Sequence, residues 1–161
     1  MSGTSADESR AGVSLTNLDQ PLFDGAGATK RDFVEYLDAV HDRIIPALED
    51  RPLSVVRVHR GQEAFMQKNV PKYAPSWVRT VDVWAEASRR NVSYALCNDR
   101  RTLLWFANQR AVEYHPALVQ VEHRGDGTGR AGLQRPGTGP SRSPKTLPSR
   151  SLNQAARVGP S

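Results

Sequence analysis

The amino-acid sequence predicts a mixed α/β or α+β half-domain followed by a disordered tail. Over residues 14–121 the periodicity changes in the order helix, several strands, helix, strand, which is typical of mixed layers. From Arg124 onward, 17 of 38 residues are Gly, Pro or Ser and none is Phe, Trp or Tyr. Such a segment cannot bury enough apolar surface to offset its ordering entropy. We therefore expect a disordered leader (1–13), one folded domain (14–121) and a disordered tail (122–161).

The first helix is predicted from Thr29 onward. Thr29 is placed to cap it, and Asp32 follows three residues later. Pro46 conflicts with an unbroken helix, so we expect a kink or an end near residues 43–45. Apolar residues at mostly three- and four-residue spacing form one helical face: Phe33, Tyr36, Leu37, Val40, Ile44 and Leu48.

Extended segments are expected after Pro52. LSVVRVH (53–59) is rich in β-branched residues, and WVRTVDVW (77–84) alternates. GQEAFMQKN (61–69) is a turn leading into a short extended segment, and VSYALCN (92–98) follows the turn-like SRRN.

A second helix is predicted for DRRTLLWFANQRAVEYH (99–115), capped by Asn98 or Asp99. Residues 114–121 are a candidate for one more strand. The three tryptophans fall within these patterns and are predicted to lie in the core: Trp77, Trp84 and Trp105.

The positive charge belongs to the tail. The whole chain has a formal net charge of +5, but residues 1–123 hold 15 Lys/Arg against 16 Asp/Glu. Residues 124–161 hold seven Lys/Arg against Asp126 alone. A basic tail attracts phosphates because counterions are released on binding, but it does not recognise a particular nucleotide sequence.

Several classes of protein are excluded by composition. Cys97 is the single cysteine, so neither an intramolecular disulfide nor a thiolate-rich metal site can form, and we expect a small buried side chain. No stretch approaches the ~20 apolar residues of a membrane span. The N-terminus lacks the apolar core of a secretory signal, so we expect a cytoplasmic protein.

Three stretches in order carry a resemblance: SLTNLDQPLFDGAGATKRDFVEYL, RPLSVVRV…FMQKNVPKYAPSWVRTV and YALCNDRRTLLWFANQRAVEYHP. Together they resemble the N-terminal part of the polymerase domain of bacterial ligase D, in the archaeo-eukaryotic primase superfamily. The resemblance covers roughly residues 14–121 and implies the N-terminal half of a primase-polymerase-like fold, with a mixed sheet and flanking helices.

The resemblance also implies a function in double-strand-break repair by non-homologous end joining. Family members are nucleotidyltransferases that fill or extend DNA ends with Mg²⁺ or Mn²⁺. The implied partners are DNA ends with a 5′-phosphate, a Ku-type end-binding protein and a DNA ligase. The implied location is the bacterial cytoplasm, in association with the nucleoid.

Lys30 is the candidate 5′-phosphate ligand, because it falls on the second of two family lysines. Gln20 stands at the first position, so half of that charge is missing, and phosphate capture is either weaker or shared with Lys68, Lys72 or Arg79. A lysine at a helix start suits a phosphate, since free N–H groups and the helix dipole both favour an anion. Without the resemblance, a solvated first-turn lysine is the commoner interpretation.

Other family positions are kept in part. Phe65 falls on an aromatic residue that stacks on the template base and Lys68 on a lysine that follows it, whereas Met66 replaces the second aromatic residue. From the residues alone, filling the core is the commoner interpretation of Phe65 and Met66. Arg57 and His115 fall on positions of the nucleotide pocket, although a lone histidine is more often structural, and Val55 and Val56 replace residues that are basic in some members.

The carboxylates of metal catalysis are missing. Two-metal nucleotidyl transfer needs clustered carboxylates, which in the family include an Asp-x-Asp on the strand after EYHP. The sequence contains no Asp-x-Asp, and Asp126 is the single acidic residue beyond Glu122. We therefore assign no catalytic residue, no metal ligand and no retained cofactor.

Three interpretations of the tail stay open, as do three of the function. Residues 122–161 are an out-of-frame translation of GC-rich DNA, a diverged end that replaced the catalytic half, or a native disordered tail. The chain is an end-processing polymerase that is inactive alone, a non-catalytic module that binds 5′-phosphorylated DNA ends, or a nonfunctional fragment with unpaired strand edges.

Overall fold

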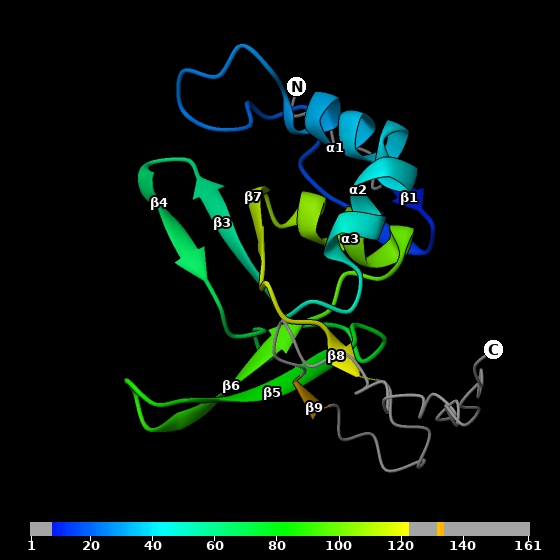
Figure 1. Ribbon diagram of the computed structural model, residues 1–161. Helices are drawn as coiled ribbons and strands as arrows, with labels where there is room; N and C mark the ends of the chain where they lie inside the picture. Colours follow the sequence, from blue (N-terminus) through cyan, green and yellow to red (C-terminus); the bar gives the residue numbers. More distant parts are fainter. Residues whose placement is uncertain (1–7, 123–131, 134–161) are drawn as a thin grey trace, which may run out of the picture.

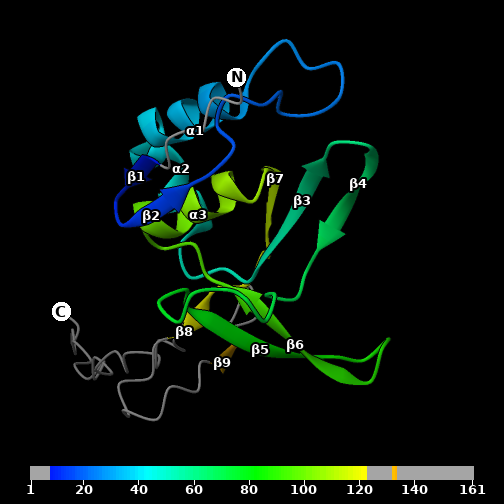
Figure 2. The same cartoon turned by 180° about the vertical axis from the view of Figure 1, so that it is seen from behind.

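The computed structural model describes residues 8–122 and 132–133. Three helices lie together on one side of a strongly bent sheet, and a long hairpin projects from the other end of that sheet (Figures 1 and 2). None of the helices in these residues is long and apolar enough to span a membrane. Most of the tail (123–131 and 134–161) and residues 1–7 of the leader lie outside the described part.

The second half of the expected leader is ordered, which corrects that prediction. Strands β1 (Glu8–Arg10) and β2 (Val13–Leu15) form an antiparallel hairpin. Val13 and Leu15 are buried in the main core, and the Asn108 side chain accepts from Thr16 N and donates to Ser14 O. Tertiary burial thus orders a segment whose polar composition predicted disorder.

Helix α1 (Lys30–Ala39) begins as expected at Thr29, which forms a complete capping box with Asp32. The break falls at Val40, earlier than residues 43–45, and Pro46 lies inside α2 (His41–Leu48). The proline is tolerated because α2 is short and Pro46 removes one backbone hydrogen bond from its second turn.

Five strands make the central sheet: β3 (Leu53–His59), β4 (Gln62–Gln67), β5 (Thr80–Ala85), β6 (Arg90–Ala95) and β7 (Ala111–Pro116). β3 is central, with β4 on one side and β7 on the other. Its pairing with β6 is limited to Leu53 opposite Ala95, which lets the β5–β6 hairpin diverge from the rest of the sheet (Figure 1). β8 (Val121–Glu122) pairs with β9 (Gly132–Leu133).

Helix α3 (Arg100–Asn108) ends earlier than expected, and residues 111–115 belong to β7. Its cap is Asp99, whose carboxylate accepts from Thr102 N. Asn98 instead exchanges two hydrogen bonds with Asp50. The helix stops because Arg110 adopts a left-handed conformation, with φ 57°, directly after the C-cap.

Helix α3 is the centre of the core. Its residues from Thr102 to Ala107 are buried between the other helices and the sheet. Trp105 is buried and Trp77 packs on the cluster, whereas Trp84 is 52% exposed on the outer side of β5, which corrects its expected burial. Cys97 is fully buried as expected, and burial raises the pKa of its thiol to about 12.

Candidate functional site

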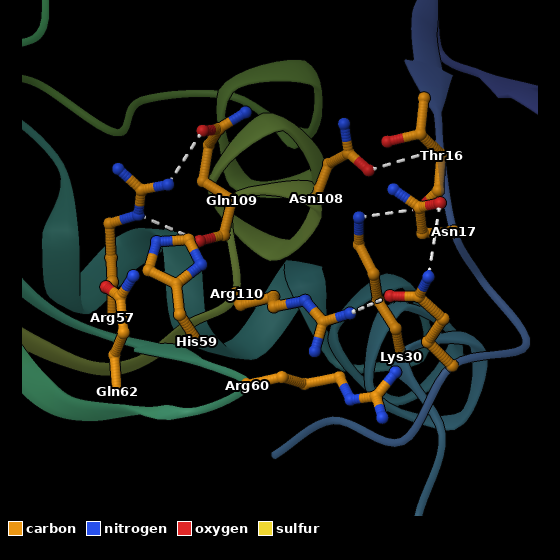
Figure 3. Close-up of a pocket in the computed structure, with 11 residues that line it drawn as sticks. Thr16, Asn17, Lys30, Arg57, His59, Arg60, Gln62, Asn108, Gln109 and Arg110 are labelled. Carbon is orange, nitrogen blue, oxygen red and sulfur yellow. Dashed lines mark hydrogen bonds between the residues drawn. The ribbon is translucent and has the colours of Figure 1, made fainter. Parts of the chain in front are cut away.

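A basic pocket of about 490 Å³ opens where four segments meet (Figure 3). The loop after β2, the start of α1, the β3–β4 turn and the end of α3 each supply part of its wall. The lining includes four cationic side chains and no Asp or Glu. The eleven lining residues are Thr16, Asn17, Gln20, Lys30, Arg57, His59, Arg60, Gln62, Asn108, Gln109 and Arg110.

Lys30 is buried, with 3% of its surface exposed, so it is not a solvated first-turn residue. Its ammonium donates to Thr16 O at 2.6 Å. Burial, and to a smaller extent the nearby charge of Arg110, lower the pKa of Lys30 to about 8. The ammonium is therefore strongly desolvated but still charged at neutral pH.

The backbone at the start of α1 does not provide the anion site that we expected there. Lys30 N donates to Gln20 O and Arg31 N to Leu18 O, while Asp32 N donates to the Thr29 hydroxyl. Because these N–H groups are already bonded within the chain, an anion in the pocket must be held by side chains.

Arg110 is the residue that sequence reasoning missed. Its side chain is 7% exposed and enters the pocket beside Lys30 (Figure 3). One guanidinium nitrogen, Nη1, donates to the carbonyl oxygens of Pro21 and Leu22, and Nη2 donates to Gln20 Oε1 at 2.9 Å. Burial and the nearby Arg60 lower the pKa of Arg110.

Arg57 lies in the same pocket, but its guanidinium is largely occupied. It donates to the backbone and side-chain oxygens of Gln109, to the Gln67 amide and to the Tyr73 hydroxyl, at 2.8–3.0 Å. Four of the five N–H donors of an arginine are then in use. Arg57 therefore ties β3 to the end of α3 and offers little to a nucleotide.

Phe65 and Lys68 line a second hollow of about 530 Å³, between β4 and the β5–β6 hairpin. Phe65 is 39% exposed and Met66 51%, so neither fills the core. His59 stacks on Phe65 with ring centroids 5.6 Å apart, and the Arg57 guanidinium lies 5.5 Å from the Phe65 ring. Since Arg57 and His59 also line the basic pocket, Phe65 connects the two hollows.

His115 lies apart from the other candidates. It is exposed on β7, opposite Ser54 of β3, and its Nε2 lies 2.9 Å from a Glu113 carboxylate oxygen. Side chains alternate along a strand, so His115 is on the face of the sheet opposite to Arg57. The structure thus does not bring together the two residues that the resemblance assigns to one nucleotide pocket.

Within the described part of the chain, the donor groups do not fit a two-metal centre. Such a centre needs clustered carboxylates, and the sequence has no Asp-x-Asp. Among residues 8–122 and 132–133, no group of three or more His, Cys, Asp or Glu is placed to hold a metal ion. Asp126 lies outside this part.

Comparison with known proteins gives a consistent result. The family profile for the LigD primase-polymerase domain matches residues 29–131, ten residues beyond the end at residue 121 that we expected. The bifunctional non-homologous end joining protein LigD of Bacillus subtilis is 35% identical over 114 residues, which are 70% of this chain and 18% of that protein. The multifunctional LigD of Mycolicibacterium smegmatis is 30% identical over 105 residues, 64% of this chain and 14% of that protein.

The fold agrees with these relatives. The polymerase domain of Mycobacterium tuberculosis ligase D, solved in complex with DNA, superposes with a TM-score of 0.69 and 28% sequence identity. The aligned part covers 79% of this chain and 43% of that domain, and this chain spans less than a fifth of the LigD relatives above. The expected mixed α/β fold with flanking helices is confirmed, and the chain belongs to the LigD primase-polymerase domain family.

Proposed function

We propose that this chain is a DNA-end-binding part of a LigD-type polymerase, acting in non-homologous end joining and recognising a 5′-phosphate. The observation that carries the proposal is the basic pocket, where buried Lys30 and Arg110 face the same space without a carboxylate in the lining. Buried charges are normally paired, so an anionic ligand completes this site.

The neighbouring hollow fits the single-stranded part of a DNA end. Phe65 presents an exposed ring, and base stacking on an aromatic ring is worth ~1–3 kcal/mol per base. Lys68 and Arg90 line the same hollow and supply charge for the sugar-phosphate backbone. His59 links the hollows through its stack on Phe65, so one DNA end reaches both sites.

Support also comes from the relatives. The ligase D domain that resembles this chain was solved with DNA, and the related LigD proteins are end-joining proteins. By the same relationship we propose a Ku-type protein and a DNA ligase as partners, with the nucleoid as the place of action. His115, which lines neither hollow, is proposed only as a contact for further nucleotide-binding parts of a polymerase.

We further propose that nucleotidyl transfer does not occur on this chain alone. The reaction needs carboxylates that hold two metal ions, and this sequence has no Asp-x-Asp to supply them. Binding of the DNA end requires no such ligands, so it remains the function that the described residues support.

The test is the affinity for a short duplex with a recessed 5′ end facing a 3′ overhang, measured by fluorescence anisotropy at fixed salt. The recessed end carries either a phosphate or a hydroxyl. We expect wild-type protein to bind the phosphorylated end about tenfold more tightly, since charge-assisted hydrogen bonds are worth ~1.5–3 kcal/mol.

Lys30→Gln should lose most of this preference. Arg43→Gln is the matched control, because Arg43 is an exposed cation on α2 that does not line the pocket. Equal affinity of the wild-type protein for both ends would overturn the proposed function.

A further inference from the structure

We infer that Arg110, positioned by Gln20, is the second phosphate-binding cation of the pocket. This inference rests on the proposed function and deepens it, because it states how the site works with a glutamine where the resemblance places a lysine. The cation comes from the end of α3, about ninety residues along the chain from Gln20.

The two buried cations of the pocket have no charged partner among the described residues. Lys30 and Arg110 are both almost fully buried, and their hydrogen bonds within the described residues all go to uncharged oxygens. More exposed arginines, by contrast, are paired: Arg31 with Glu8 and Arg100 with Asp38, each at 2.6 Å. The buried cations thus lack a charged partner while more exposed ones have it, which is the opposite of the usual pattern, in which buried charges are paired. Two unneutralised buried cations facing one space indicate an anionic ligand.

Arg110 and Lys30 keep N–H donors that the described residues do not use. An arginine has five N–H groups, and three of those of Arg110 are used by Pro21 O, Leu22 O and Gln20 Oε1. Within residues 8–122, no oxygen accepts from its Nε–H or from the second Nη2 N–H. Lys30 uses one of its three donors. Four N–H groups of these two cations therefore remain free to donate to phosphate oxygens.

The backbone of Arg110 adopts a conformation that is uncommon for arginine. Arg110 has φ 57°, in a region that most residues with a Cβ avoid, and it stands where a helix usually ends with glycine. The conformation sends a long cationic side chain from the end of α3 across to the loop that contains Gln20. Because a glycine would suit this backbone better, we attribute the presence of arginine at this position to the function of its side chain.

Gln20 has a matching role. Its amide oxygen accepts from Arg110 and its amide nitrogen donates to Asn17, so a neutral acceptor holds the guanidinium in place. A lysine at residue 20 would bring a third ammonium or guanidinium group next to Arg110 and Lys30. Gln20 and Arg110 therefore form a functional pair that replaces the first of the two lysines implied by the resemblance, while Lys30 keeps the second.

The pair predicts the outcome of a charge swap. The preference for a 5′-phosphate over a 5′-hydroxyl end is measured as above for wild type, Arg110→Gln, Gln20→Lys and the double variant Gln20→Lys/Arg110→Gln. We expect Arg110→Gln to remove most of the roughly tenfold preference, as Lys30→Gln does. Gln20→Lys should give no gain, because it displaces Arg110, and the double variant should recover most of the preference because its lysine restores the second cation.

A direct measurement on wild-type protein keeps the inference testable if a variant unfolds. The ¹H–¹⁵N resonance of the Arg110 Nε–H should shift when 5′-phosphorylated DNA is added and stay in place with 5′-hydroxyl DNA. An unchanged resonance, or a folded Arg110→Gln variant with full phosphate preference, would overturn the role of Arg110. In both cases wild-type protein still prefers the phosphate, whereas loss of that wild-type preference would overturn the proposed function itself.

Discussion

Lys30 is the pocket group whose charge changes in the physiological and mildly alkaline range. Arg57, Arg60 and Arg110 also line the pocket, and arginine as a residue type is always charged in proteins. Burial and the charges of Arg57 and Arg110 lower the pKa of His59, which adds no positive charge above neutral pH. Folding lowers the pKa of Lys30 from 10.5 to about 8, so burying its charge costs stability below pH 8 and this cost disappears as the pH rises.

The phosphate preference should therefore fall as the pH rises through about 8. A bound phosphate favours the protonated amine, and deprotonation removes one cation from the pocket. We expect the preference for a 5′-phosphate to be roughly fivefold lower at pH 9 than at pH 7. In Lys30→Arg the preference should stay level over this range, and a wild-type profile that is equally level would exclude Lys30 as a ligand.

Phe65 should contribute to binding of a single-stranded DNA overhang and not to the folding stability of the protein. Phe65→Ala is expected to weaken binding of a duplex with a single-stranded overhang by ~1–3 kcal/mol while binding of a blunt duplex changes little. Tyr36→Ala is the control, since Tyr36 is an exposed aromatic residue on α1, away from both hollows. An equal loss on blunt and overhanging DNA would argue against stacking on Phe65.

At the scale of elements, the start of α1 positions the pocket. The capping box fixes the first turn, which carries Lys30, and the loop before it carries Gln20. Two backbone hydrogen bonds, Lys30 N to Gln20 O and Arg31 N to Leu18 O, tie this loop to the helix. Stability of the helix start and geometry of the site are therefore linked.

Thr29→Ala should lower the free energy of unfolding by ~1 kcal/mol, because it removes the cap of α1. Thr29→Ser keeps the hydroxyl that accepts from Asp32 N and should retain most of the stability. Urea titration of the three proteins measures the difference. If the alanine variant were as stable as wild type, the capping box would not hold the helix start.

The sequence predicted elements well where the signal was local. The capping box at Thr29, the β-branched strand of residues 53–59 and the burial of Cys97 all depend on near neighbours or on side-chain type. The ordered hairpin β1–β2 was missed because it is stabilised by contacts with α3, far along the chain.

The candidate site could be predicted only in part for the same reason. Lys30 and Phe65 came from the resemblance, and the structure places both at hollows. Arg110 enters the pocket through a left-handed turn that no periodicity marks. The available signal was that no glycine separates the helix from the strand that follows it, so a helix end with positive φ there has to use another residue.

At the scale of the whole molecule, this chain matches 43% of a solved ligase D polymerase domain. The β4–β3–β7 part of the sheet has its helices on one face, while the exposed side chains of Met66, Glu113 and His115 lie on the other. The described residues provide a contiguous core and a basic pocket but no cluster of metal ligands.

We therefore expect DNA binding without nucleotide addition. A primer-extension assay with Mg²⁺ or Mn²⁺ and a 5′-phosphorylated template end should give no product with this chain. The same preparation must bind the DNA, which shows that it is folded. Extension by pure protein would refute the proposal that this chain lacks catalysis on its own.

The most direct test of the phosphate site is a pH titration of the 5′-phosphate by ³¹P NMR, free in DNA and bound to this chain. The second pKa of a phosphate monoester is ~6, and nearby cations lower a pKa by ~1–3 units. We expect the bound phosphate to titrate at least about one unit lower with wild-type protein, and closer to free DNA with Lys30→Gln. An unchanged midpoint in the wild-type complex would contradict a phosphate held between Lys30 and Arg110.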